Sequence, residues 1–475
     1  MTSGSSVRPS PVDSATKDCP RCRTRRIACD RTLPHCRKCI SRNFVCPGYG
    51  IVLRWAQGVA SRGKLAGRAI PLHGESDKPN GLSIAPQLQV FDTVSSELLR
   101  HFNSGVASKL AWVDGPANPW RHIILPLSHV SPTVLSSVLA IAAQDLTSKY
   151  TPDHPYLRRL RMACFHYLGQ ALSSLRQQLG ALRRSPGSPI CPSQARCLLA
   201  STLLLYNLEL LNPEAARWQL HIQGARAIIQ EAIRCPDSLE EADVFLFYEY
   251  YYACVFIGLT TFDPTDGSTP SDIPTHDRIT IFSDFVRITH SVTKVERVKF
   301  TTGSNPQPYT LRLDAVRAEI ELAKQRTLHL SQAIPFSSPT AQRDFAHLTC
   351  MYYHASLIYS HQVLADDASA QEATRNIRSS REAILDHLDH LTQRTFFTQD
   401  LVWPLFMAGT ECRGLPDKQG LIERAMLDVM RVSGSLDRRR VLSFLQMFWR
   451  QDLGRYVNWI HFARTMSSGG GFLIL

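Results

Sequence analysis

The feature that most constrains this sequence is a repeat of cysteines near the N-terminus. The pattern C-x2-C-x6-C occurs twice with six residues between the copies, which places cysteines at Cys19, Cys22, Cys29, Cys36, Cys39 and Cys46. Two thiolates separated by two residues can bind one tetrahedral zinc ion. One zinc ion would use four of the six cysteines, whereas two zinc ions need eight ligand positions. Six cysteines fill eight positions only if two of them bridge both ions, so the repeat predicts a cluster of two Zn²⁺ ions.

Other uses of the six cysteines fit the sequence less well. A redox pair needs only one CxxC and normally lies in a βαβ unit. Three disulfides need an oxidising compartment, but residues 1–18 have no apolar core and do not resemble a signal peptide. The other seven of the 13 cysteines occur singly in apolar helical stretches. We therefore expect a soluble intracellular protein, with no membrane partner because the apolar runs are too short to span a bilayer.

The positive charge of the chain is concentrated around these cysteines. Residues 1–75 contain 14 Lys or Arg and four Asp or Glu, a net charge of +10, whereas residues 76–475 carry only +2. A short and strongly basic segment is typical of proteins that bind a polyanion. Six thiolates and two Zn²⁺ ions would carry a charge of about −2, and the basic residues outnumber that charge. The segment therefore predicts binding to a polyanion, beyond neutralisation of the cluster.

The cysteine pattern resembles that of the fungal binuclear zinc-cluster transcription factors, C-x2-C-x6-C-loop-C-x2-C-x6–8-C, and the match runs from Cys19 to Cys46 without a gap. The resemblance implies that Cys19 and Cys36 bridge the two metals. It also implies two short helices, which start near Cys22 and Cys39 and are related by a pseudo-two-fold axis. In this family the basic residues between the second and third cysteines enter the major groove of double-stranded DNA and typically read a CGG triplet.

Three arginines occupy those basic positions, Arg23, Arg25 and Arg26. Because a guanidinium can pair with O6 and N7 of guanine in the major groove, such residues can read sequence. Arg26 matches the principal base-reading position of the family, so we expect it to contact a base. The candidates for phosphate contacts, which position a protein without reading sequence, are Arg23, Arg25, Arg37 and Lys38. Ala28 departs from the family, which usually has Lys or Arg there, and this departure bears on the strength of the CGG preference.

The sequence predicts four consecutive segments. Residues 1–17 form a disordered tail, residues 18–48 the zinc-cluster DNA-binding domain, residues 49–90 a basic linker rich in Gly and Pro, and residues 91–475 an all-α regulatory domain. Many relatives follow the cluster with a coiled coil, but residues 47–70 contain five glycines and no sustained heptads. Two alternatives stay open for DNA binding, a monomer and a homodimer held together by the large domain.

Helix signals dominate from residue 91 to the end of the sequence. Ser131 followed by Pro132 is a typical helix start, and after a cap at Asp153 apolar residues recur at steps of three and four between residues 157 and 182. Further helices are expected near residues 193–211, 214–233, 239–261, 311–331, 339–366, 371–393, 417–433 and 439–465. Without alternating strands or a tandem repeat, the predicted fold class is a small, loop-rich zinc-cluster domain with two short helices, followed by a large all-α domain.

Two segments of the large region resemble the fungal-specific regulatory domain of one branch of zinc-cluster factors. They include residues 118–121 (NPWR) and residues 218–225 (WQLHIQGA). The resemblance implies a regulatory role, exerted through a small-molecule effector or through transcriptional co-regulators. The pair Gly224 and Ala225 would let two helices approach closely, so we interpret it as packing and not as a ligand site.

The sequence contains no enzymatic constellation. It lacks HExxH, a Walker A loop, a Rossmann glycine triplet and GxSxG. His387 and His390 lie one helical turn apart, but the flanking Asp386 and Asp389 favour a solvated helix face over a metal site. The acidic and aromatic run at residues 240–252 is interpreted as a partly buried helix, because so many adjacent aromatics seldom stay exposed.

The sequence therefore predicts a nuclear, sequence-specific DNA-binding regulator of RNA polymerase II transcription, and not an enzyme. Its zinc cluster would read a CGG-like triplet, and its helical domain would regulate activity, for instance at a metabolic or secondary-metabolite gene cluster. The alternative is a zinc-dependent protein-interaction module without sequence-specific DNA reading. Two separate zinc ions in such a module need eight ligands, and His35 is the only spare candidate near the cysteines, which disfavours this alternative.

Overall fold

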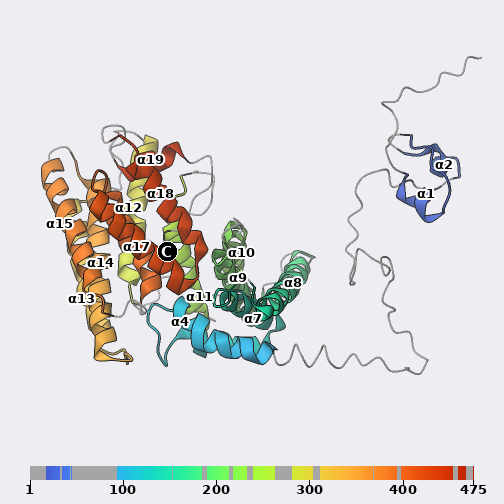
Figure 1. The fold of residues 1–475 in the computed structure, drawn as a ribbon, viewed down its shortest axis with the longest axis horizontal. Helices are drawn as coiled ribbons and strands as arrows, with labels where there is room; N and C mark the ends of the chain where they lie inside the picture. Colours follow the sequence, from blue (N-terminus) through green and yellow to red (C-terminus); the bar gives the residue numbers. More distant parts are fainter. Residues whose placement is uncertain are drawn as a thin grey trace, which may run out of the picture. The chain divides into compact units, whose positions relative to one another are not determined.

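The computed structural model describes residues 18–32, 35–42, 44, 46, 94–151, 153–184, 190–212, 218–232, 239–262, 281–302, 311–366, 369–392, 397–452, 458–466 and 474. These residues belong to two compact units, Met1–Leu82 and Ser83–Leu475, which we describe separately (Figure 1). The predicted tail at residues 1–17 and the predicted linker at residues 49–90 lie outside the described residues.

The described residues of the N-terminal unit include two short helices, and each of them starts directly after a cysteine. Helix α1 spans Pro20–Thr24 and helix α2 spans Arg37–Ile40, so both begin two residues before the expected positions. Cys19 and Cys36 cap these helices, because the Sγ of each accepts a hydrogen bond from the backbone N–H three residues later. Helices of four or five residues are not stable alone. The cysteines buried between the two helices therefore form the core of this unit.

The large unit is built from helices, and its described residues include no β-strand. Its first half contains a helical segment at 94–101, the π-helix η2 Phe102–Val106, and helices α4 Ala107–Leu110, α5 Pro119–His122, α6 Ile124–Val130, α7 Pro132–Thr147, α8 Pro155–Arg184, α9 Pro192–Leu210, α10 Trp218–Ala232 and α11 Glu241–Gly258. Its second half contains α12 Ser283–Thr302, α13 Leu313–Ser331, α14 Pro339–Leu364, α15 Ala370–Asp389, the 3₁₀ helix η4 Thr398–Leu401, α16 Val402–Thr410, α17 Pro416–Ser433, the 3₁₀ helix η5 Leu436–Arg438, α18 Arg439–Trp449 and α19 Trp459–Thr465. The predicted all-α class is confirmed.

The helices of the large unit form two groups that share one hydrophobic core. In the first group α7 packs against α6, α8 and α9, and α10 packs against α9. In the second group α14 packs against α12, α13, α15 and α16. Helix α11 contacts α9, α10 and α12, so it joins the two groups (Figure 1). Across the described residues, no helix is both long enough and apolar enough to cross a bilayer.

Several helix signals of the sequence are confirmed in detail. Ser131 caps α7, since its side chain accepts the N–H of Val134 at 3.4 Å. The apolar stripe of α8 is buried, with Leu157, Leu160, Cys164, Ala171 and Leu175 as its most buried members. The acidic and aromatic run lies almost wholly in α11, where most side chains are buried. Capping of α8 by Asp153 is wrong, because the residue before Pro155 is His154, whose Nδ1 accepts the N–H of Tyr156 at 3.2 Å.

Three features of the large unit differ from expectation. Helix α12 was not predicted, because its many Val, Ile and Thr residues have low helix propensity. Helix α16 was not predicted either, because all its residues are buried and no polar face marks a period. The single helix expected at residues 439–465 is divided into α18 and α19.

Gly224 lies where α10 packs against α9, in agreement with the packing interpretation. A Cβ atom on Gly224 would meet Cγ2 of Thr202 at 3.8 Å, which is an ordinary van der Waals contact, so an alanine would also fit there. The neighbouring Ala225 is completely buried.

Two other glycines give opposite predictions for stability. Gly434 ends α17 with a φ of 74°, which side chains avoid, whereas Gly169 lies inside α8, and a Cβ there would meet nothing within 4 Å. Gly434→Ala is expected to lower the free energy of unfolding by about 1 kcal/mol. Gly169→Ala is expected to raise it by about 0.5–1 kcal/mol, because Ala loses less backbone entropy in a helix. Urea denaturation followed by circular dichroism measures both changes, and two shifts of the same sign would contradict this account.

Candidate metal centre and nucleic-acid interface

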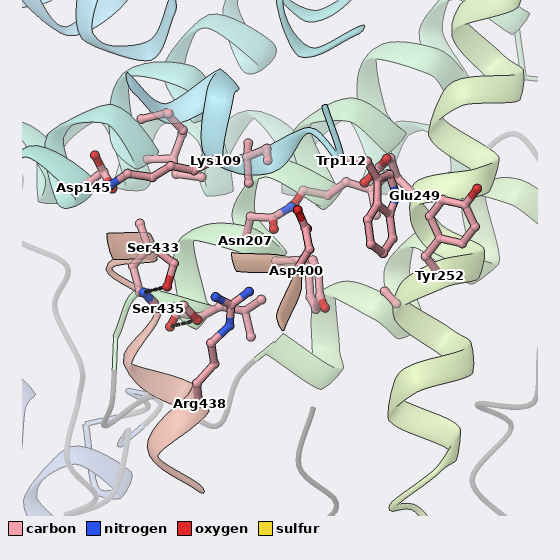
Figure 2. Close-up of a pocket in the computed structure, with 18 residues that line it drawn as sticks. Lys109, Trp112, Asp145, Asn207, Glu249, Tyr252, Asp400, Ser433, Ser435 and Arg438 are labelled. Carbon is pink, nitrogen blue, oxygen red and sulfur yellow. Dashed lines mark hydrogen bonds and ion pairs between the residues drawn. The ribbon is translucent and has the colours of Figure 1, made fainter. Parts of the chain in front are cut away.

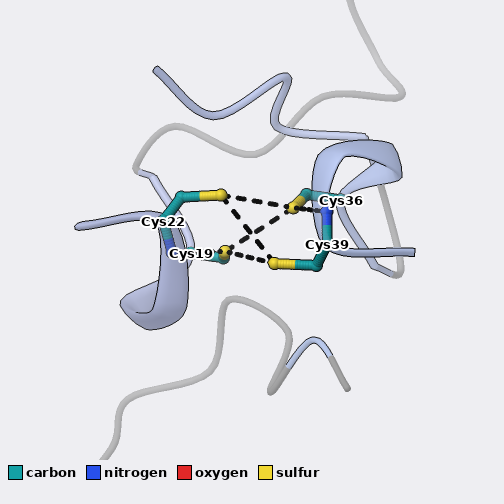
Figure 3. A group of neighbouring side chains, drawn as sticks. All are labelled: Cys19, Cys22, Cys36 and Cys39. Carbon is teal, nitrogen blue, oxygen red and sulfur yellow. Dashed lines mark hydrogen bonds between the residues drawn. The ribbon is translucent and has the colours of Figure 1, made fainter. Parts of the chain in front are cut away.

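Four cysteine sulfurs form a compact cluster between α1 and α2. The Sγ atoms of Cys19 and Cys22 each lie 3.6 Å from that of Cys36 and 3.8 Å from that of Cys39 (Figure 3). All four side chains are completely buried. A tetrahedral zinc ion with Zn–S bonds of about 2.3 Å holds its sulfurs about 3.8 Å apart. The spacing of the four sulfurs therefore fits zinc.

The other two cysteines of the repeat occupy equivalent places in its two halves. The backbone N–H of Cys19 donates to Sγ of Cys29 at 3.4 Å, and the N–H of Cys36 donates to Sγ of Cys46 at 3.4 Å. The Sγ atoms of Cys29 and Cys36 also lie within 4.8 Å of each other. The two copies of the sequence repeat thus make the same local contacts, as a pseudo-two-fold arrangement requires.

Arg26 lies in the turn that ends α1 and not in the helix itself. Its φ of 52° is left-handed. The N–H of Arg26 donates to the carbonyl of Arg23 at 3.2 Å, and the N–H of Ile27 donates to the carbonyl of Cys22 at 3.1 Å. Helices often end with this pair of bonds, and glycine is then usual at the left-handed position. An arginine there costs about 1 kcal/mol, and strain of this kind is common at functional positions.

The five candidate DNA-contacting side chains are all exposed: Arg23, Arg25, Arg26, Arg37 and Lys38. None of them forms an ion pair with a carboxylate of the described residues, whereas Arg31 pairs with Asp18 at 2.7 Å. Exposed cations without a carboxylate partner are suited to phosphate oxygens and to the acceptor atoms of base edges. The structure thus brings all five to the surface of the unit that holds the sulfur cluster.

Asp30 contacts the start of α2, and this contact was not predicted from the sequence. Its carboxylate accepts the backbone N–H of Arg37 at 3.1 Å and that of Lys38 at 2.8 Å, at the start of α2. Burial acts to raise the pKa of Asp30, but hydrogen bonds from the backbone of Thr32, Lys38 and Arg37 lower it below its ordinary value. Asp30 therefore fixes the start of the helix that carries two candidate phosphate contacts. Its separation of seven residues from Arg37 conceals this role in the sequence.

Phe44 is a second residue whose contacts were not predicted from the sequence. The guanidinium carbons of Arg21 and Arg25 lie 4.6 and 4.5 Å from the centre of its ring. A guanidinium over an aromatic face is attracted to the ring. Phe44 of the second half thus orients two arginines of the first half, including the candidate Arg25.

Two family descriptions match the chain. That of the fungal Zn(2)-Cys(6) binuclear cluster domain matches residues 17–56, and that of the fungal specific transcription factor domain matches residues 97–469, which is most of the chain. The chain belongs to the fungal Zn(2)-Cys(6) transcription factors. Its two domains are those of DNA-binding transcription regulators, and its four-cysteine cluster fits a zinc site of this family's type.

A shorter match links this transcription factor to a curated relative. The acriflavine sensitivity control protein acr-2 of Neurospora crassa is 54% identical over 43 residues, which is 9% of this chain and 7% of that protein. No solved structure was found to match the chain. The matched part of the relative is small, so what that protein controls is not transferred to this one.

The histidines of α15 differ from the predicted solvated face. His390 is exposed, but His387 is half-buried, and its Nδ1 lies 2.9 Å from Nδ1 of His347 on α14. Burial and the proximity of His347 lower the pKa of His387. His387 therefore belongs to the interface between α14 and α15, and only His390 fits the prediction.

Proposed function

We propose that this transcription factor acts in the nucleus on RNA polymerase II genes and reads a CGG-like triplet through a cluster of two Zn²⁺ ions. The observation that carries the proposal is a buried cluster of sulfurs surrounded by exposed arginines without carboxylate partners. The proposed zinc ligands are Cys19, Cys22, Cys29, Cys36, Cys39 and Cys46. Cys19 and Cys36 are proposed to bridge both ions, since each lies close to cysteines of both halves.

The zinc ions would supply the positive charge that lets six thiolates pack together, and they would fix α1 against α2. The exposed basic residues of the chain would then contact the DNA. We propose that Arg26 pairs with O6 and N7 of a guanine, because it is exposed and held at a strained turn. Arg23, Arg25, Arg37 and Lys38 would bind phosphates and set the register of the cluster on the duplex.

The proposal is tested with the full-length protein and short duplexes in a gel-shift titration. At about 150 mM salt, where non-specific phosphate contacts are weakened, a duplex with a CGG triplet is expected to bind more tightly than a scrambled duplex. The difference should be at least tenfold, which corresponds to about 1.4 kcal/mol. Equal binding to both duplexes would favour a zinc-dependent interaction module that does not read sequence.

Two variants separate base reading from phosphate binding. Arg26→Gly removes the side chain and suits the left-handed turn, so the unit stays folded while discrimination between the two duplexes falls by about 1–3 kcal/mol. Lys38→Ala is the matched phosphate control. It is expected to weaken binding to both duplexes equally and to reduce the slope of log K against log salt by about 1. If Lys38→Ala changed the discrimination and Arg26→Gly did not, the assigned roles would be reversed.

The large helical domain is proposed to regulate this activity through a small-molecule effector, through co-regulators, or through both. Its match to the fungal specific transcription factor domain supports a regulatory role. Dimerisation, if the protein dimerises, is proposed to involve this domain. Mapping of genomic binding sites by chromatin immunoprecipitation would identify the controlled genes, and would test whether they form a metabolic cluster.

A further inference from the structure

The large unit contains a cavity of about 110 Å³ with several charged lining residues, where α9, α11, η4 and η5 come together. Its charged lining residues are Lys109, Asp145, Glu249, Asp400 and Arg438 (Figure 2). Figure 2 shows Trp112, Glu249 and Tyr252 on one side of this cavity and Ser433, Ser435 and Arg438 on the other. We refer to this space as the polar lobe.

A second cavity, of about 300 Å³, adjoins the polar lobe, since Trp112, Glu249 and Tyr252 line both. Its other aromatic walls are Trp120, Phe245 and Tyr248. We refer to this space as the aromatic lobe. Its lining also includes the exposed residues Asp114, Ala117, Glu241 and Pro335. The aromatic lobe therefore reaches the protein surface, and Glu249 lies where it meets the polar lobe.

The aromatic walls are held in fixed positions by their own packing. The rings of Trp112 and Tyr252 are 5.9 Å apart in an edge-to-face arrangement. The rings of Trp120 and Phe245 are 5.3 Å apart in the same kind of arrangement. Preformed aromatic surfaces of this kind bind flat apolar groups, and their faces also attract cations.

Glu249 is a carboxyl of the polar lobe to which the described residues supply no cationic partner. Lys109 and Asp145 form an ion pair at 2.6 Å. Burial raises the pKa of Asp400 well above its ordinary value, against the opposing effect of the charge of Arg438, so Arg438 is the cation that acts on Asp400. Glu249 makes no hydrogen bond and no ion pair with the described residues, and its charge contributes to the raised pKa of Asp400.

Glu249 is surrounded by protein but keeps accessible surface, because that surface faces the two lobes. Burial raises its pKa to about 8. The hydroxyl of Tyr206 is a second polar group that lines the polar lobe without a hydrogen-bond partner. Only 3% of Tyr206 is exposed. Buried polar groups normally find a partner within the protein, so these two groups indicate a ligand.

We infer that the two lobes form one binding site for a small aromatic amine, whose ring system occupies the aromatic lobe and whose ammonium group pairs with Glu249. An ammonium ion would supply the cation that Glu249 lacks and would favour the ionised form of its carboxyl, and the faces of Trp112 and Tyr252 would stabilise the same charge. An anionic ligand would be repelled by an ionised Glu249. A neutral ligand would supply no charge opposite to that carboxylate.

This inference deepens the proposed regulation by a small-molecule effector and rests on it for its biological consequence. Binding itself is measured without DNA. Equal binding to the CGG and scrambled duplexes would therefore not argue against the amine site. Equal binding of the amine and alcohol probes would not argue against DNA reading.

The test is a calorimetric titration of the full-length protein with two probes of nearly the same shape. The first is 1-naphthylmethylamine, which is a cation at neutral pH, and the second is 1-naphthalenemethanol, which is neutral. The amine is expected to bind at least about tenfold more tightly than the alcohol. In Glu249→Gln this preference should disappear, while the affinity for the alcohol stays the same.

Glu319→Gln is the matched control, because Glu319 is an exposed glutamate on α13 and does not line either lobe. It should keep the full preference for the amine. The inference is overturned if the wild-type protein binds both probes equally or binds neither, and also if Glu249→Gln still prefers the amine. The comparison of the two probes on wild-type protein does not depend on how any variant folds.

Discussion

Removal of zinc is expected to unfold residues 18–46 and to abolish DNA binding, while the large helical unit stays folded. The core of the N-terminal unit consists of cysteines, with Ile27 and Phe44 packed against them, and its helices are too short to be stable alone. For clusters of this kind the free energy of metal binding, about 10–16 kcal/mol in zinc-finger peptides, is the free energy of folding. A chelator should therefore eliminate the gel shift but change the helical circular dichroism only slightly, and added zinc should restore the shift.

Cysteine variants make this prediction specific. Cys36→Ser is expected to reduce the zinc content from two ions per chain to one or none and to abolish DNA binding, because Cys36 is proposed to bridge both ions. Cys191→Ser is the matched control, since Cys191 is an exposed cysteine outside the cluster. It should keep two zinc ions, as measured by atomic emission. A gel shift that survives both the chelator and Cys36→Ser would show that the cluster has no role in DNA binding.

The zinc cluster could be predicted from the sequence because the spacing of its cysteines already specifies the chemistry. The local structure around it was less accessible. Arg26 lies in a left-handed turn where glycine is the usual residue, so the sequence carried no signal for that turn. Asp30 and Phe44 act across the two halves of the repeat. Such contacts depend on how the halves are placed, which spacing alone does not specify.

The helical domain shows the same division between local and distant effects. Helices with one apolar face, such as α8, were predicted because their period is visible in the sequence. Helix α16 was missed because it is buried on all sides. The binding cavity was missed for a different reason. Glu249 is one acid in an aromatic run, and its environment is made by Asp400 and Arg438, more than 140 residues later in the chain.

Replacement of Glu249 by glutamine is expected to make the helical unit more stable at high pH and to leave its stability unchanged at low pH. The pKa of Glu249 is raised to about 8 by burial, whereas an unfolded glutamate titrates near its ordinary value of about 4.3. Between these two values the unfolded chain releases a proton that the folded protein keeps. The free energy of unfolding of the wild-type protein therefore falls as pH rises through this range, and it levels off above pH 8.

Glutamine does not titrate, so in Glu249→Gln this decrease in the free energy of unfolding does not occur. The free energy of unfolding of the variant should equal that of the wild-type protein near pH 4 and exceed it by up to about 5 kcal/mol above pH 8. Urea denaturation at several pH values measures the difference, which includes the effect of removing the Glu249 charge on the raised pKa values of Asp400 and Tyr206. Glu319→Gln should show no such pH-dependent gain. If the two free energies of unfolding differed by the same amount at every pH, Glu249 would be ionised in the folded protein and a cation would already accompany it.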